Sequence, residues 1–188
     1  AILSKKLNLK LNIARGFRAP AIPELASNGA HEGTLRYEYG DPNLNSETST
    51  QIDAGLDYNS EHISVNVSGF YNNFDNFIFI RKLEAAAGGD SMLNVNGYDV
   101  TAFIFGQQQA SLTGAELTVD IHPHPLDWLH IQNTFSLVSG ILKVPVEGAK
   151  YLPFIPASRL NTELKKKKKK PADNIQNFYA TFDVDITF

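Results

Sequence analysis

Several features that would place this chain in a familiar class are missing from its sequence. It contains no cysteine, which excludes disulfide bonds and thiolate metal sites. No apolar run reaches the roughly 18 residues that a membrane-spanning helix needs. The net charge is only −3 and there is no basic face, so we expect no nucleic-acid partner. What remains is 188 residues, 43% of them hydrophobic, which is enough for one domain.

The dominant pattern that is present is a strict alternation of apolar and polar residues. It is clearest at residues 7–14, 51–58 and 178–188, and it recurs at 62–71, 114–122, 129–137 and 159–164. A period of two indicates strands with two different faces. No segment shows a convincing 3.6-residue period. We therefore expect an all-β chain of about seven strands.

The connections between these strands alternate in length. Long or medium loops are expected at about 17–47, 81–104 and 140–157, and short turns at 59–62, 122–125 and 169–174. Outer-membrane barrels combine short periplasmic turns with long extracellular loops. The sequence thus predicts an antiparallel transmembrane β-barrel. A soluble sandwich with its loops gathered at one end remains the alternative.

The two faces of the expected strands differ in chemistry. Tyr58, Tyr71 and Trp128 come at strand ends, where a barrel has its interfacial aromatic belts. The polar face is acidic, and we predict that four of its side chains face the lumen: Asp53, Asp57, Glu116 and Asp120. In a barrel the apolar face would meet outer-membrane lipid. A solvent-facing sheet could carry the same acids.

Seven is an odd number of strands, whereas single-chain bacterial barrels have even numbers. An open sheet in lipid leaves unsatisfied backbone groups along two edges. The first ten residues also lack the apolar core and cleavage site of a signal peptide. We therefore expect an incomplete barrel, as a fragment or a piece of a larger one, whose remaining strands are partners of this chain.

Specific motifs support this expectation. The stretch "GFRAPAIPEL" at 16–25, followed by "DPNLNSE" at 41–47, strongly resembles the C-terminal barrel half of TonB-dependent outer-membrane receptors, of the kind typical of Bacteroidota. Further resemblances are "FYNNFDNFIF" at 70–79, the hairpin at 109–140 and "YLPFIPASRL" at 151–160. Departures are Asp41 where Asn is usual, and Asn45-Ser46 where Lys-Pro is common.

The resemblance implies a barrel of about 22 strands in the outer membrane of a Gram-negative bacterium. Such receptors bind a scarce ligand, often an iron–siderophore or another metal chelate, and import it when TonB pulls on an N-terminal plug. Residues 1–188 would all belong to the barrel domain, with the plug absent. The resemblance implies no cofactor and no enzyme activity. Alternatives are a soluble β-sheet binding module and a barrel with a structural or adhesive role.

Candidate ligand-binding residues lie on the longest expected loop. An anionic or aromatic chelate could contact its charged and aromatic side chains: Arg18, His31, Glu32, Arg36, Tyr37 and Tyr39. Packing of these residues within the loops is the alternative, and Arg18 could equally anchor the base of the loop. Gln107, Gln108 and Gln109 are expected to lie on both faces of the wall, with some of them facing the lumen.

Other motifs give weaker indications of function. His122 and His124 in "HPHP" have the spacing of a metal-ligand pair, but two prolines favour a rigid turn, and we predict no metal site. His130 and Ser136 would be about 20 Å apart along one strand, too far for a nucleophile and its base. The lysine run at 165–170 is expected to be a solvated turn region that departs from the family pattern.

Overall fold

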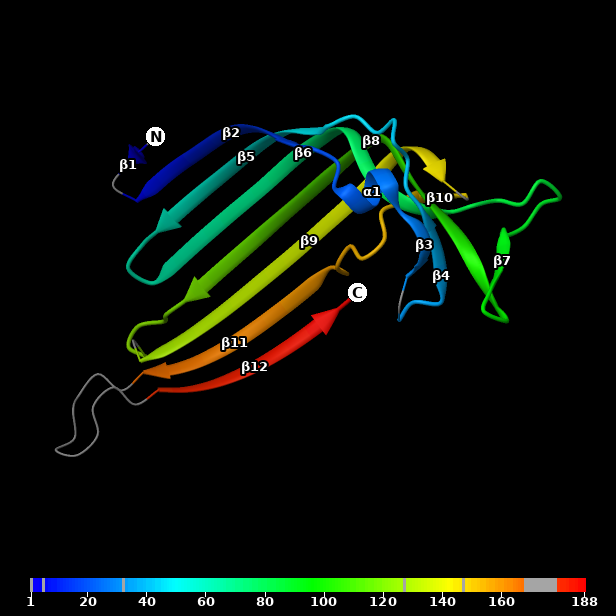
Figure 1. Cartoon of the computed structure of the whole chain (residues 1–188). Coiled ribbons are helices and arrows are strands. Elements are labelled where there is room, and N and C mark those ends of the chain that lie inside the picture. Colours follow the sequence, from blue (N-terminus) through cyan, green and yellow to red (C-terminus); the bar gives the residue numbers. More distant parts are fainter. Residues whose placement is uncertain (1, 5, 32, 127, 147, 168–178) are drawn as a thin grey trace.

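A curved antiparallel sheet forms the body of the molecule (Figure 1). The computed structural model describes residues 2–4, 6–31, 33–126, 128–146, 148–167 and 179–188. Seven strands form the wall, in the order of the sequence: β2 (Leu7–Arg18), β5 (Glu47–Asn59), β6 (Ile63–Lys82), β8 (Tyr98–Ile121), β9 (Leu129–Val146), β11 (Arg159–Lys167) and β12 (Tyr179–Thr187). Each of these strands pairs with its predecessor, as the alternating sequence predicted.

Smaller elements complete the described part of the chain. They are β1 (Ile2–Ser4), α1 (Ile22–Ala26), β3 (Asn28–His31), β4 (Arg36–Tyr39), β7 (Met92–Val95) and β10 (Ala149–Tyr151). All of them except β1 lie at one end of the wall, while the short connections between β5 and β6 and between β8 and β9 lie at the other (Figure 1). The predicted separation of long and short connections is confirmed.

The expected loops are more structured than the sequence indicated. Helix α1, β3 and β4 lie within the expected loop at 17–47, and β7 lies within the one at 81–104. Strands β6, β8 and β9 also continue beyond the predicted strand ends, so the expectation that Tyr71 ends a strand was wrong. Helix α1 has only five residues, and the expected all-β class is confirmed. The predicted turn at 169–174 lies outside the described residues.

The register keeps the two faces of the wall separate. Val67 lies opposite Leu56 on one side and Leu117 on the other, so the apolar residues form continuous rows across the strands. Among the residues that the structure describes, none covers this apolar face. Leu11 is 72% exposed, Ile13 is 75% exposed and even Val67, in a central strand, is 42% exposed. The sheet therefore has an apolar surface where a soluble sandwich would have a core.

The hydrophobic core is small and lies at the end of the wall that carries the long connections. Ala110, Leu142 and Leu152 are its buried members, with Phe74 and Phe77 packed beside them. Leu152 comes from the segment that follows β10, which folds back onto the wall. Within the described residues, no helix is long and apolar enough to cross a membrane.

A β-bulge in β6 separates the regular part of the wall from its extension. The pairing of β6 with β8 shifts between Phe74 and Phe77, and Asn76 adopts a positive φ of 57°. Beyond this point Ile78 is buried, although it belongs to a strand whose earlier apolar residues are exposed. The extension is therefore packed by neighbouring segments, whereas the regular part of the wall is not.

Candidate functional site

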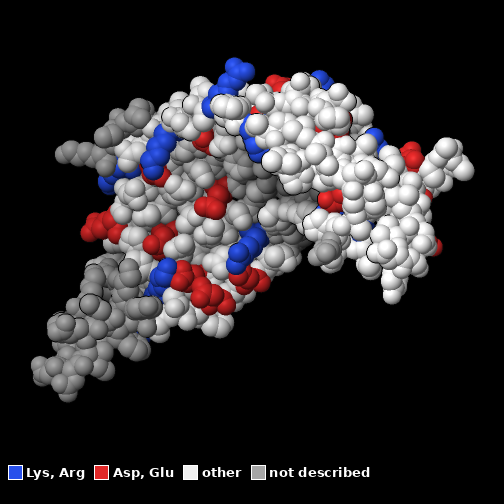
Figure 2. All heavy atoms as spheres, in the orientation of Figure 1, with Lys and Arg blue, Asp and Glu red and all other residues white. Residues whose placement is uncertain are grey.

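The polar face of the wall carries the four acidic residues that the sequence assigned to a lumen. Register places Asp53, Asp57, Glu116 and Asp120 on the face opposite the apolar rows. Asp57 pairs with Lys10 at 2.6 Å. Asp53 accepts hydrogen bonds from Asn12 at 2.9 Å and from Gln51 at 2.6 Å. Charged side chains gather on the face seen in Figure 2.

A hollow of about 450 Å³ opens on the wall near its centre. The side chains of Lys10, Asn12, Asp53 and Glu116 line it, together with the ring of Phe70. Phe70 lies directly over Gly114, where an added Cβ would come within 2.4 Å of the ring carbon Cε1. Glycine at 114 therefore leaves room for the aromatic ring of Phe70 on this face of the wall.

Arg18 fastens the base of the first long connection. Its Nη1 lies 2.8 Å from Glu24 Oε2 on α1, and its Nη2 lies 3.3 Å from Glu47 Oε2 at the start of β5. The same Glu47 oxygen accepts a hydrogen bond from the backbone N–H of Ile78 at 3.0 Å. Arg18 thus connects β2, α1 and β5. This arrangement favours its interpretation as an anchor over direct contact with a ligand.

Glu24 is the partner whose ionisation holds this anchor. Burial raises the pKa of its carboxyl, but hydrogen bonds from Arg18 and from the Ala21 backbone N–H outweigh that effect and lower the pKa below its ordinary 4.5. A carboxyl with a lowered pKa stabilises the folded state above its unfolded pKa. That stabilisation is lost as the pH falls through the lower, folded-state value.

We therefore expect Glu24→Gln to loosen the segment from Arg18 to Ala26. At about pH 6, amide hydrogen exchange in this segment should be about two- to fivefold faster than in the wild type, because the ion pair is partly exposed. The difference should shrink as the pH falls through the lowered folded-state pKa of Glu24, because the wild-type carboxylate then becomes protonated as well. Glu61→Gln, at the opposite end of the wall, is the control. A difference that persists at low pH would contradict this account.

Strand β4 brings three of the predicted ligand-binding residues into one short segment but divides them between its faces. Arg36 forms an ion pair with Glu38 and lies 5.6 Å from the centre of the Phe103 ring. Glu38 is the buried charged residue here, with 7% of its surface exposed. The guanidinium of Arg36 is therefore engaged within the protein.

The two tyrosines of β4 lie on its other face. The rings of Tyr37 and Tyr39 are 4.9 Å apart and tilted, and the Tyr37 hydroxyl donates to Asn28 Oδ1 at 3.0 Å. Strand β4 is held by antiparallel pairing with β3 and by parallel pairing with β8, where Tyr39 lies opposite Ile104. An aromatic pair on a supported strand can stack against a planar or aromatic ligand.

The remaining predicted loop residues are not all gathered with these tyrosines. His31 in β3 lies opposite Arg36 in the register, so its side chain is on the same face of the sheet as Arg36 and Glu38. The Thr34 hydroxyl lies 3.2 Å from His31 Nδ1. Glu32 lies outside the described residues. Of the expected glutamines, Gln107 accepts a hydrogen bond from the Asn45 N–H, and Gln108 accepts one from the Val144 N–H.

A grouping of side chains at the short-turn end of the wall was not predicted from the sequence. Asp120, His122 and His130 offer ligand atoms that all lie within 4.8 Å of one another. His124, which the sequence paired with His122, instead lies against His62, with ring centres 5.9 Å apart. The register was the available signal, because Ile121 lies opposite Ile131 and this brings positions 122 and 130 across from each other.

Comparison with known proteins supports the architecture. The family described as TonB dependent receptor-like, beta-barrel matches residues 2–183. Among solved structures, the copper transporter OprC has a TM-score of 0.62 at 17% identity, over 97% of this chain and 29% of its own length. The siderophore receptor PirA from Pseudomonas aeruginosa has a TM-score of 0.56 at 16% identity, over 98% of this chain and 30% of its own.

A third structure agrees with these two. The siderophore receptor PirA from Acinetobacter baumannii has a TM-score of 0.53 at 12% identity, over 98% of this chain and 32% of its own length. At such identities the likeness concerns the fold. The chain thus spans about a third of the length of the structures it matches.

Proposed function

Because this chain belongs to the TonB-dependent receptor β-barrel family, we propose that it forms part of the wall of a receptor that imports a metal chelate. Members of this family are transporters in the outer membrane of Gram-negative bacteria and not enzymes. The proposed ligand is an iron–siderophore or a related metal complex. The names of the matched structures, a copper transporter and siderophore receptors, support this ligand class.

The observation that carries the proposal is the exposed apolar face of the wall. In β6 the apolar row runs from Ile63 to Tyr71 and then gives way to Asn73. A membrane-spanning strand of a barrel needs about 9–11 residues. The apolar row of β6 therefore has the length of a bilayer crossing. Tyr58 and Trp128 near the short-turn end, and Tyr71 at the other limit of the row, match the positions of aromatic belts.

The proposal includes the partners that such a wall needs. Outer-membrane lipid covers the apolar face, and further strands pair with the open edges of β2 and β12, since unpaired edges are costly in lipid. A plug domain lies against the acidic inner face and connects the receptor to TonB. The long connections, with Tyr37 and Tyr39 as a stacking pair, form part of the extracellular ligand surface.

A complementation experiment tests this function. Cells that lack the gene are given either the wild-type gene or Tyr37→Ala/Tyr39→Ala, and uptake is measured with radioactive iron bound to a catecholate or a hydroxamate siderophore. We expect a heat-modifiable outer-membrane band from both genes. Uptake of one chelate should be restored by the wild type and reduced at least about tenfold in the double variant, which loses two stacking contacts.

Tyr98→Ala is the matched control, because Tyr98 is an exposed tyrosine at the start of β8. It should restore uptake fully. A soluble band with no heat modifiability would overturn the placement in the outer membrane. A correctly inserted receptor whose presence leaves the uptake of both chelates unchanged would overturn the proposed ligand class.

A further inference from the structure

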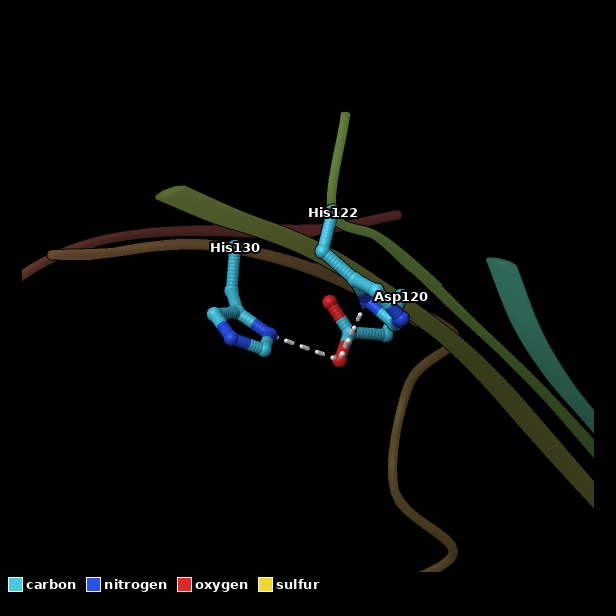
Figure 3. A group of neighbouring side chains, drawn as sticks. All are labelled: Asp120, His122 and His130. Atoms are coloured by element: carbon cyan, nitrogen blue, oxygen red, sulfur yellow. Dashed lines mark hydrogen bonds and ion pairs between the residues drawn. The ribbon is translucent and has the colours of Figure 1, made fainter. Parts of the chain in front are cut away.

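The histidine grouping at the short-turn end has the arrangement of a metal site. His130 Nδ1 lies 3.1 Å from Asp120 Oδ2, and His122 Nδ1 lies 3.7 Å from the same oxygen. Figure 3 shows the two imidazoles on either side of the Asp120 carboxylate. Three ligand groups, one from β8, one from the residue that directly follows it and one from β9, thus converge on one small volume.

Two of the possible ligand atoms in this grouping are unpaired in the part of the chain that the structure describes, whereas His130 Nδ1 and Asp120 Oδ2 are hydrogen-bonded to each other. Asp120 Oδ1 and His122 Nδ1 are both shielded from solvent, and neither has a hydrogen-bond partner among the described residues. Buried polar atoms are normally paired, so two such atoms in one cluster call for an explanation. A cation held by His122 Nδ1 and by the Asp120 carboxylate would supply a partner at this position.

The spacing fits a tetrahedral ion. Zinc binds imidazole nitrogen and carboxylate oxygen at about 2.0–2.2 Å, which places neighbouring ligands of a tetrahedron about 3.3–3.6 Å apart. The two measured separations, 3.1 Å and 3.7 Å, lie on either side of this interval. The ligand atoms of all three groups lie within 4.8 Å of one another, so they would draw closer around an ion that replaces the hydrogen bond between His130 and Asp120.

We propose that Asp120, His122 and His130 bind a borderline divalent transition-metal ion such as Zn²⁺. Two imidazoles and one carboxylate suit Zn²⁺, Ni²⁺ or Cu²⁺ better than Ca²⁺ or Mg²⁺, which prefer oxygen ligands. Three protein ligands leave one position open for water or for a group from another molecule. This goes beyond the proposed function, because the site is remote from the long connections and does not depend on which chelate they bind.

The positively charged neighbour of the site is already neutralised. Lys165 lies opposite His130 in the register, but its Nζ is held 2.5 Å from Glu163 Oε2. The ion pair reduces the repulsion that an approaching cation would experience. His62 and His124 form a separate ring contact nearby. His124 therefore provides a control histidine outside the proposed site.

Zinc titration of the native outer-membrane protein that carries this chain, purified in detergent, tests the site. We expect the wild type to bind one Zn²⁺ that Asp120→Asn and His130→Gln each bind at least about tenfold more weakly, because each loses a ligand. His124→Gln, two residues from His122, should bind as the wild type does. Boiled and unboiled gel mobility establishes that each variant is folded.

Equal Zn²⁺ affinity in the wild type and in the two ligand variants would overturn the proposal. Should a variant fail to fold, electron paramagnetic resonance of the wild type loaded with Cu²⁺ decides the question. Hyperfine coupling to two imidazole nitrogens is expected from His122 and His130. A spectrum with oxygen ligands alone would refute the site.

Discussion

Val67→Arg is expected to reduce the stability of the lipid-inserted protein by about 2–4 kcal/mol, whereas Ser68→Arg, at the adjacent residue, should leave it almost unchanged. Val67 lies midway along the apolar row from Ile63 to Tyr71, so an arginine there would be placed near the centre of the bilayer. Charged residues on the lipid face of a barrel cost about this much at the midplane.

The matched control uses the opposite face of the same strand. Ser68 lies opposite Glu116 on the polar face and lines the hollow there, so an arginine at this position can stay hydrated and find a carboxylate. Reversible urea unfolding from phospholipid vesicles, followed by gel mobility, measures both variants. A cost of 2–4 kcal/mol corresponds to a change of about 30- to 1,000-fold in the unfolding equilibrium.

The dependence of the arginine cost on depth along the apolar row shows whether a bilayer or a protein core causes this effect. Ile63→Arg places the same charge at the end of the row, near the short turns. The cost of arginine falls to about 0–1 kcal/mol near the membrane interface. If Val67→Arg and Ile63→Arg were equally costly, or if Ser68→Arg were as costly as Val67→Arg, the apolar face would not be a lipid contact.

The wall was predictable from sequence because its two faces meet different surroundings along the whole of each strand. Val65 and Val67 alternate with Asn66 and Ser68, and their partners in β5 and β8 do the same. This local pattern needs no knowledge of distant contacts. It also indicated the face of Asp53 and Asp120, since a side-chain period of two leaves no other choice.

Prediction failed where distant segments determine the structure. After the bulge at Asn76, the run "FIFI" no longer alternates, because neighbouring segments cover the extension and Ile78 is buried. Strand β4 is only four residues long and depends on parallel pairing with β8, some 65 residues later in the chain. Neither feature leaves a periodic signal in its own sequence.

In the candidate sites, too, residue types were predictable from the sequence, whereas contacts between distant segments were not. Arg36, Tyr37 and Tyr39 were identified by residue type as loop residues, but only the strand pairing separates Arg36 from the two tyrosines. The His122–His130 contact was hidden because these residues flank a turn and are eight positions apart. Hairpin register, and not spacing within "HPHP", determines which histidines meet.

Gly40→Ala is expected to disrupt the end of the wall that carries the long connections, while the wall itself stays intact. A Cβ at Gly40 would lie 2.5 Å from the Ala26 nitrogen and 2.7 Å from the Ser27 nitrogen. These are backbone atoms, so no side chain can rotate away and the segments themselves must separate. Two hydrogen bonds join them here, from Gly40 N–H to Ser27 O and from Asp41 N–H to Glu24 O.

Separation of these segments should release α1 from the end of β4 and displace Tyr39. Overpacking of this kind typically costs about 1–3 kcal/mol, which corresponds to about 5- to 150-fold faster hydrogen exchange through local opening. Exchange in residues 18–40 should therefore rise, and chelate uptake should fall at least about tenfold, while gel mobility continues to report a folded barrel.

Gly29→Ala separates the effect of this contact from the general effect of replacing a glycine in the same connection. Gly29 has open space where a Cβ would lie, so the added methyl group should change neither exchange nor uptake. Faster exchange in Gly40→Ala without any loss of uptake would separate the loop structure from ligand binding and would remove Tyr37 and Tyr39 from the proposed ligand surface. Unchanged exchange would instead show that the close approach of α1 to β4 is not maintained in the membrane.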